Sequence, residues 1–131
     1  MTVALALSAL AIEPALSSAE CRNTSVQSEL TICAYQEFER ADRDLNHLWA
    51  RLIAKARSCD RSADCGRTAS DQRSEEQILR KGQRAWVQFR DAQCEYEGLD
   101  ERGGSMEPMT VNLCLARLTH ERIKQLNSTE K

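Results

Sequence analysis

Apolar residues recur at steps of three or four along three stretches of the chain, the spacing that places side chains on one face of an α-helix. The first stretch predicts a long helix over residues 25–57, the second a helix that ends near Gly98, and the third a helix over residues 107–126. The apolar positions of the first stretch are Leu30, Ala34, Phe38, Ala41, Leu45, Leu48, Leu52 and Ala56. Those of the second are Ile78, Gly82, Ala85, Phe89, Ala92 and Tyr96, and Leu79 and Trp86 widen this stripe. Those of the third are Val111, Leu115, Leu118, Ile123 and Leu126, with Arg122 beside them. Each helix is expected to bury its apolar stripe against the other two.

Polar residues at the start of each stretch are candidates for helix capping. Thr24 and Gln27 form a candidate capping box for the first helix. Either Ser70 or Ser74 can cap the second helix, and Ser105 is the expected N-cap of the third.

The connections between the predicted helices, residues 58–69 and 97–104, are short and read as loops. The chain has only five Gly and two Pro, which disfavours a fold of many strands joined by frequent turns. We therefore predict an all-α fold stapled by disulfides, either an antiparallel three-helix bundle or a helical hairpin with a third helix packed on it.

Composition places the chain among globular proteins of one domain, with 131 residues, of which 41% are hydrophobic and 29% charged. The formal net charge is −2, and such a chain is poorly suited to binding a polyanion. Nucleic acid is therefore not an expected partner.

The N-terminal segment is predicted to be a signal peptide covering residues 1–19. Its apolar run, residues 3–12, is followed by small residues at 17–19 and then by Glu20, a pattern typical of a cleavage site. The alternative is an N-terminal helix of the folded domain. Because a run of about ten residues is too short to span a bilayer, no stable membrane anchor is expected. Residues 20–131 then form one exported domain, periplasmic or secreted.

Six cysteines lie after the predicted leader, and an even number behind an export signal favours disulfides formed in an oxidising compartment. Spacing along the chain does not settle the connectivity, but closeness favours the pairs Cys21–Cys33, Cys59–Cys65 and Cys94–Cys114. Zinc binding is the competing interpretation. It has little support because the chain has no C-x-x-C pair and its two histidines, His47 and His120, are isolated. We expect no metal and no cofactor.

Four short motifs occur in order along the region after the leader. They are Ala41-Asp42-x-x-Leu45-Asn46, Gln83-Arg84-Ala85-Trp86-x-x-Phe89-Arg90-Asp91-Ala92-Gln93-Cys94, Gly103-Gly104-Ser105-x-x-Pro108 and Cys114-Leu115-Ala116-Arg117-Leu118-Thr119-x-x-Arg122. Together they resemble the LprI-type lysozyme inhibitor family. The resemblance implies a small exported helical domain, in a family named for a member that inhibits lysozyme. Cys59 and Cys65 depart from the common pattern of that family and suggest an extra staple in the first loop.

The polar and aromatic motif residues have a structural and a functional interpretation. Charged groups beside an apolar stripe are rarely left unpaired, so we expect pairing between helices, such as Asp42 with Arg90 and Asp91 with Arg122. Direct binding or catalysis is the alternative for the polar residues, whereas the aromatic ones are expected to pack. The set consists of Asp42, Asn46, Arg84, Trp86, Phe89, Arg90, Asp91, Thr119 and Arg122.

The second loop and its flanks are strongly acidic. Between residues 95 and 107 there are five acidic residues and one basic residue, a local charge of −4. An acidic surface suits a basic partner, and glycines permit close backbone approach. The candidate partner-binding residues are Glu97, Asp100, Glu101, Gly103, Gly104, Ser105 and Glu107. In the alternative interpretation the glycines only form the turn, Ser105 caps the helix, and Glu107 is favoured by the helix N-terminus.

Catalysis has little support in the sequence, because no nucleophile lies in a recognisable catalytic arrangement and the cysteines are expected to be oxidised. We expect no catalytic residues and no enzyme. Together with the resemblance to the LprI-type family, these observations lead us to expect an exported protein that binds a basic lysozyme and blocks cell-wall hydrolysis. The alternative is a cell-envelope interaction module with another partner and no inhibitory activity.

Overall fold

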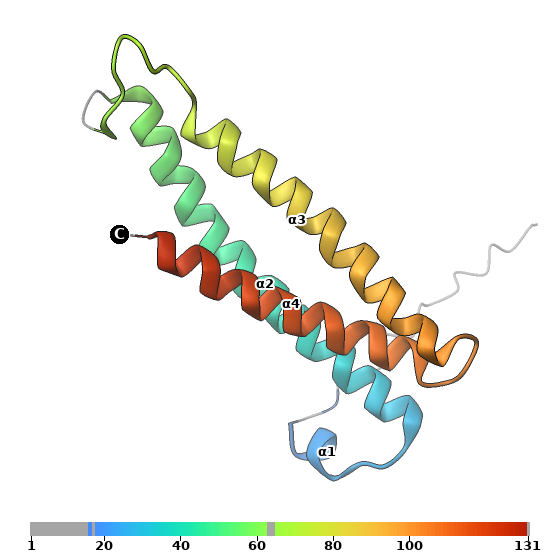
Figure 1. Cartoon of the computed structure of the whole chain (residues 1–131). Coiled ribbons are helices and arrows are strands. Elements are labelled where there is room, and N and C mark those ends of the chain that lie inside the picture. Colours follow the sequence, from blue (N-terminus) through green and yellow to red (C-terminus); the bar gives the residue numbers. More distant parts are fainter. Residues whose placement is uncertain (1–15, 17, 63–64, 131) are drawn as a thin grey trace, which may run out of the picture.

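The computed structural model describes residues 16, 18–62 and 65–130, and the described part is all-α (Figure 1). Its elements are α1 (Ser18–Asn23), α2 (Gln27–Arg61), α3 (Glu75–Gly98), the short 3-10 helix η2 (Leu99–Glu101) and α4 (Glu107–Thr129). The helices α2 and α3 form an antiparallel hairpin, and α4 crosses it while running in the same general direction as α2 (Figure 1). This arrangement confirms the predicted helical bundle. Most of the predicted leader lies outside the described residues.

Leucines of α2 and α4 form the larger part of the core. Leu45, Leu48, Leu52 and Leu126 are buried together. Half-buried Trp49, Leu79, Trp86 and Ile123 pack around this cluster. A second cluster, Cys94, Cys114 and Leu118, lies where the end of α3 meets α4. The stripes predicted for the first and third helices therefore face the core, as expected from their spacing.

The stripe predicted for the second helix is the exception, because only Leu79 and Trp86, which widened it, pack on the core, and the prediction is wrong for its six other positions. In α3 the side chains of Ile78, Phe89 and Tyr96 are 55%, 55% and 71% exposed. The side of α3 that faces the core instead carries Leu79 and Trp86, which are half-buried. The disulfide near the C-terminal end of α3 sets the rotation of the helix about its own axis, because Cys94 must face Cys114 on α4.

The three disulfides join the pairs favoured by closeness along the chain. Cys21–Cys33 ties α1 to α2, Cys59–Cys65 ties the end of α2 to the following connection, and Cys94–Cys114 joins α3 to α4. Cys94 and Cys114 are buried. The bundle is therefore cross-linked near three of its connections.

Two of the predicted caps differ in the structure. The first helix has Val26 at its N-cap with no capping side chain. Thr24 lies outside it, where its hydroxyl accepts a hydrogen bond from the Val26 N–H at 3.0 Å. Gln27 is consequently the first helical residue rather than the third, so no capping box forms. The third predicted helix begins at Glu107 as expected, but Met106 occupies its N-cap, and Ser105 does not cap it.

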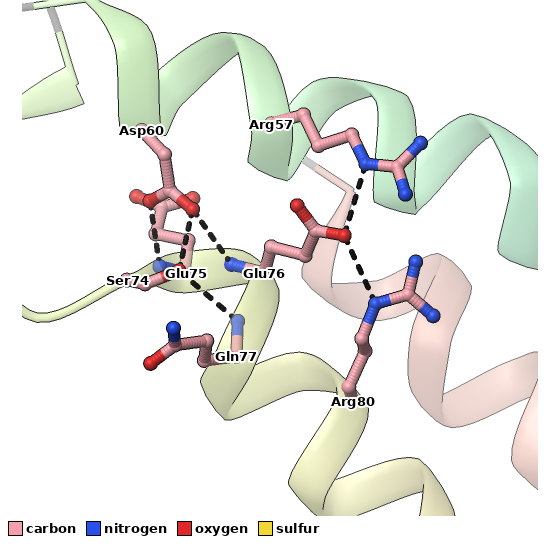
Figure 2. Close-up of polar contacts among 7 residues, drawn as sticks. All are labelled: Arg57, Asp60, Ser74, Glu75, Glu76, Gln77 and Arg80. Atoms are coloured by element: carbon pink, nitrogen blue, oxygen red, sulfur yellow. Dashed lines mark hydrogen bonds and ion pairs between the residues drawn. The ribbon is translucent and has the colours of Figure 1, made fainter.

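Helix α3 begins with a cap supplied partly by α2 (Figure 2). Ser74 is the N-cap, as predicted, and its hydroxyl oxygen accepts from the Gln77 N–H at 3.1 Å. The same hydroxyl donates to Asp60 of α2 at 2.6 Å. Asp60 also accepts from the backbone N–H groups of Glu75 at 2.8 Å and Glu76 at 3.2 Å. One α2 carboxylate thus satisfies donors that the first turn of α3 leaves unpaired.

Ser70, the alternative cap, instead exchanges a hydrogen bond with Thr68 within the connection. Beyond the cap, Glu76 accepts from Arg57 of α2 and from Arg80 of α3, each at 2.9 Å (Figure 2). The pair with Arg57 joins the two helices at the end of the hairpin, whereas the pair with Arg80 lies within α3.

Candidate functional site

The acidic connection between α3 and α4 is a tight turn that depends on its glycines. Gly98, the last residue of α3, packs so closely on α4 that a Cβ atom there would lie 2.6 Å from Val111 Cγ2. Gly103 has a φ of +72°, which disfavours residues with a Cβ atom. Its N–H donates to the Glu107 carboxylate at 2.7 Å. The turn thereby holds the start of α4 beside the end of α3.

Two of the predicted partner-binding carboxylates have internal roles. Glu97 accepts hydrogen bonds from Gln93 at 3.1 Å and from Arg117 of α4 at 2.9 Å. These contacts, the one from Gln93 foremost, hold the pKa of Glu97 below its ordinary value of 4.5. The Glu107 carboxylate accepts the hydrogen bond from the Gly103 N–H in the turn. The other five candidates lie in or next to the turn, with Glu101 half-buried and Asp100, Gly103, Gly104 and Ser105 exposed.

A groove of about 400 Å³ opens beside this turn, where α2, α3 and α4 meet. Half-buried apolar side chains and carboxylates line it together, with Arg90 among them. We call it the acidic groove, lined by Phe38, Val111, Leu115, Asp91, Glu95, Glu107 and Arg90. It combines an apolar surface with carboxylates contributed by two helices.

Sequence reasoning found only part of this groove. Glu107 was among the candidate contacts, and Glu95 was counted in the acidic segment but not selected. The sequence predicts that Asp91 pairs with Arg122 and that Phe38 packs in the core. The spacing of Asp91 and Glu95, four residues apart on one helix, was the available signal that both belong to one surface.

The base of the acidic groove is Arg90, a guanidinium that is only 8% exposed. It lies over two aromatic rings, 5.0 Å from the centroid of Trp86 and 5.3 Å from that of Phe38. It donates to the Thr119 hydroxyl at 3.4 Å and lies 3.6 Å from the Asp42 carboxylate. The predicted pairing of Asp42 with Arg90 is therefore confirmed.

The second predicted bridge is wrong, because Asp91 pairs with its neighbour Arg90 at 2.9 Å and not with Arg122. Arg122 donates to Gln83 at 3.0 Å and lies 5.7 Å from the Trp86 ring centroid. Its position farther along α4 places it beside the first half of α3. Burial lowers the pKa of Arg122 from its ordinary value.

The remaining motif residues divide between core and surface. Thr119 is fully buried, and Asn46 donates to Asp42 at 3.3 Å. Arg84 and Phe89 are exposed, which for Phe89 contradicts the expected packing role.

No group of three or more His, Cys, Asp and Glu side chains in the described part of the chain is placed to hold a metal ion. His120 contacts Glu37 of α2 at 3.0 Å. Hydrogen bonds from Arg40 and then His120 lower the pKa of Glu37. Within residues 18–62 and 65–130, no helix is both long and apolar enough to cross a membrane.

Residues 18–126 match the model of the family described as "Lysozyme inhibitor LprI". The chain belongs to this family. It is also 40% identical over 107 residues to a protein of Rhizobium meliloti (strain 1021) named "Uncharacterized protein R02472", an alignment that covers 82% of this chain and 76% of that relative. No solved structure matches the chain. The LprI match covers α2, α3 and α4 up to residue 126, and it therefore includes every residue that lines the acidic groove.

Proposed function

We propose that this protein is an exported inhibitor of lysozyme, which binds a basic lysozyme through the acidic groove and the adjoining α3–α4 turn and so blocks cell-wall hydrolysis. Membership of the LprI family supports the class of activity. The observation that carries the choice of surface is the groove itself, in which apolar side chains and carboxylates from α3 and α4 lie together. The three disulfides suit a protein that works outside the cytoplasm.

The chemistry of the groove favours a cationic protein surface as its partner. An Arg or Lys side chain of the partner places its aliphatic stem on Phe38 and Leu115 and its charge beside Asp91 or Glu95. Asp100 and Glu101 extend the acidic surface into the turn. Complementary charge of this kind speeds association and selects the partner more than it adds affinity.

Inhibition is tested by the clearing of a cell-wall suspension by hen-type lysozyme, with the purified oxidised protein titrated in. We expect inhibition that saturates near one inhibitor per lysozyme and is lost after the disulfides are reduced. Lysis that continues unchanged at a large excess of folded protein contradicts inhibition of this lysozyme and favours the alternative, an envelope interaction module without inhibitory activity.

The surface is tested by the double charge reversal Asp100→Lys with Glu101→Lys, which we expect to weaken inhibition at least tenfold through lost charge complementarity. The matched control is Asp44→Lys with Glu130→Lys, which changes the net charge equally at exposed residues on α2 and beyond the end of α4. Equal inhibition by the two double variants contradicts the assignment of the surface. Both must retain the melting temperature of the parent protein.

A further inference from the structure

The exposed stripe of α3 has the spacing of a coiled-coil seam. Its six positions, separated by steps of 4, 3, 4, 3 and 4, are Ile78, Gly82, Ala85, Phe89, Ala92 and Tyr96. This is the alternation of a and d positions in a heptad, continued over about 27 Å of helix. All six residues are exposed, and α3 runs along one margin of the molecule in Figure 1. The seam therefore has no helix against it within the described part of the chain.

The seam is symmetric about Val87, so it is complementary to itself when a second copy runs antiparallel. Rotation about this point sets Ile78 against Tyr96 of the second copy, and Gly82 against Ala92 of the second copy. Ala85 then faces Phe89 of the second copy. In each pair one position is an a and the other a d, the pairing of an antiparallel coiled coil. Every aromatic side chain meets a smaller one, which lets the two helices interdigitate.

Gly82 supports close contact with a second helix. Nothing lies within 4 Å of the place that a Cβ atom would occupy at this residue. Glycine in the middle of a helix is less favourable than alanine, so the fold of one chain gives no reason for it. A second helix packed on the seam would explain the glycine, because the missing side chain allows the two helix backbones to approach each other.

Charges beside the seam agree with the same arrangement. Lys81 and Glu95 lie on its solvent-facing flank and are exposed. Neither has an ion-pair partner among the described residues of its own chain. In the antiparallel pair, Lys81 lies opposite Glu95 of the second copy on each side of the twofold axis, while Gln88 meets its own equivalent at the centre. Opposite charges at such flanking positions select partner and orientation.

We propose that the protein forms an antiparallel homodimer through the outer face of α3. This inference is argued without lysozyme binding, but Glu95 also lines the acidic groove, so a second copy and a bound lysozyme would compete for this carboxylate. Because sedimentation of the protein alone is the readout, failure of the dimer leaves the proposed inhibition untouched.

The first experiment is sedimentation velocity of the oxidised protein from about 5 µM to about 500 µM, since dimer population rises with concentration by mass action. We expect the weight-average mass to rise from that of one chain toward that of two. Phe89→Glu is expected to abolish this rise while keeping the helical circular dichroism and melting temperature of the monomer. The matched control is Leu113→Glu on α4, where another large apolar side chain is 49% exposed. A mass of one chain at every concentration, or equal loss in both variants, overturns the proposal.

A charge exchange tests the orientation. Lys81→Glu alone and Glu95→Lys alone each place like charges opposite one another at both contacts, one on each side of the twofold axis, so each is expected to weaken self-association several-fold. An equimolar mixture of the two variants restores opposite charges at both contacts and is expected to recover dimer formation. Recovery is specific to the antiparallel pairing of residues 81 and 95. A mixture that associates no better than either variant alone overturns this arrangement.

Discussion

At the scale of single residues, Arg90 shows how one side chain joins three helices. Its guanidinium lies over Phe38 of α2 and Trp86 of α3, near Asp42, and donates to Thr119 of α4. The planar group can stack on rings while its edge donates hydrogen bonds, which an ammonium group cannot do in the same way. A charged residue thus contributes to packing as well as to pairing.

Replacing Arg90 with Lys is expected to lower the free energy of unfolding by about 2 kcal/mol, because the charge is kept but the stacking and the bond to Thr119 are lost. Chemical denaturation in urea measures the change. Arg84→Lys on the exposed side of the same helix serves as the control and is expected to change stability by less than about 0.5 kcal/mol. A similar loss in both variants contradicts the role assigned to Arg90.

Two glycines are expected to respond oppositely to alanine. Gly82→Ala should raise the free energy of unfolding of the monomer by about 0.5 to 1 kcal/mol, since the helix gains propensity and the added methyl group meets no atom. Gly103→Ala should lower it by about 1 kcal/mol or more, because φ is +72° there. Thermal melts at low concentration, where the chain is monomeric, compare the two. The same sign of change for both would contradict this account.

At the scale of elements, the hairpin of α2 and α3 is closed by a cap that belongs to both helices. Asp60, near the end of α2, accepts from Ser74 and from two N–H groups of the first turn of α3. The Ser74 hydrogen bond, followed by the two backbone bonds, lowers the pKa of Asp60 below its ordinary 3.8. The contact therefore stabilises the fold only while this carboxyl group is ionised.

Asp60→Asn is expected to lower the melting temperature at neutral pH. Because the pKa is lower in the folded than in the unfolded chain, the contribution is complete above pH 3.8 and is lost as the pH falls through the folded value. The difference in melting temperature between the parent and this variant should therefore shrink below pH 3.8, while Asp44→Asn changes little throughout. A pH-independent difference would show that the ionised cap is not its cause.

The disulfide between α3 and α4 closes a chain segment of 20 residues at the end of the bundle that carries the acidic groove. Replacing both Cys94 and Cys114 with Ala is expected to lower the free energy of unfolding by about 3 kcal/mol, largely because the unfolded chain regains freedom. Denaturation curves of the oxidised proteins measure this loss. The same change at Cys59 and Cys65, which closes only six residues, should cost less. A larger loss at that second pair would contradict the loop-length argument.

At the scale of the whole molecule, binding of a basic partner depends more on how the charges are distributed than on the net charge of the chain. The net charge is only −2, yet the segment from residue 95 to residue 107 carries −4. Interactions between exposed charges are screened by salt, with a Debye length of about 10 Å at 0.1 M. Binding through the acidic surface should therefore depend on ionic strength although the chain as a whole is nearly neutral.

Raising the salt concentration from about 50 mM to about 500 mM is expected to weaken binding to a basic lysozyme several-fold, mainly by slowing association. Surface plasmon resonance separates the two rate constants. The variant with Asp100→Lys and Glu101→Lys should lose most of this salt dependence, and the control variant at Asp44 and Glu130 should keep it. Equal salt dependence in all three proteins would contradict steering by the α3–α4 turn.

The sequence by itself determined the number of long helices, the approximate positions of their ends and the favoured disulfide pairs. These features depend on near neighbours, because helical periodicity is set within a few turns and Ser74 needs only the N–H of Gln77 to cap α3. The ion pair between Asp42 and Arg90 could also be predicted from the sequence, since both residues lie beside apolar stripes.

Only the tertiary structure decided which side of α3 is buried and which surfaces are left open. Two overlapping apolar faces were available on that helix, and the disulfide from Cys94 to α4, with the close fit of Gly98, selects the face with Leu79 and Trp86. The acidic groove likewise requires three helices to meet, with Phe38 about 50 residues away from Asp91 along the chain. Local sequence patterns predict which side chains each helix can bury. The rotation of a helix about its axis, and so the face that is actually buried, depends on contacts between residues far apart in sequence.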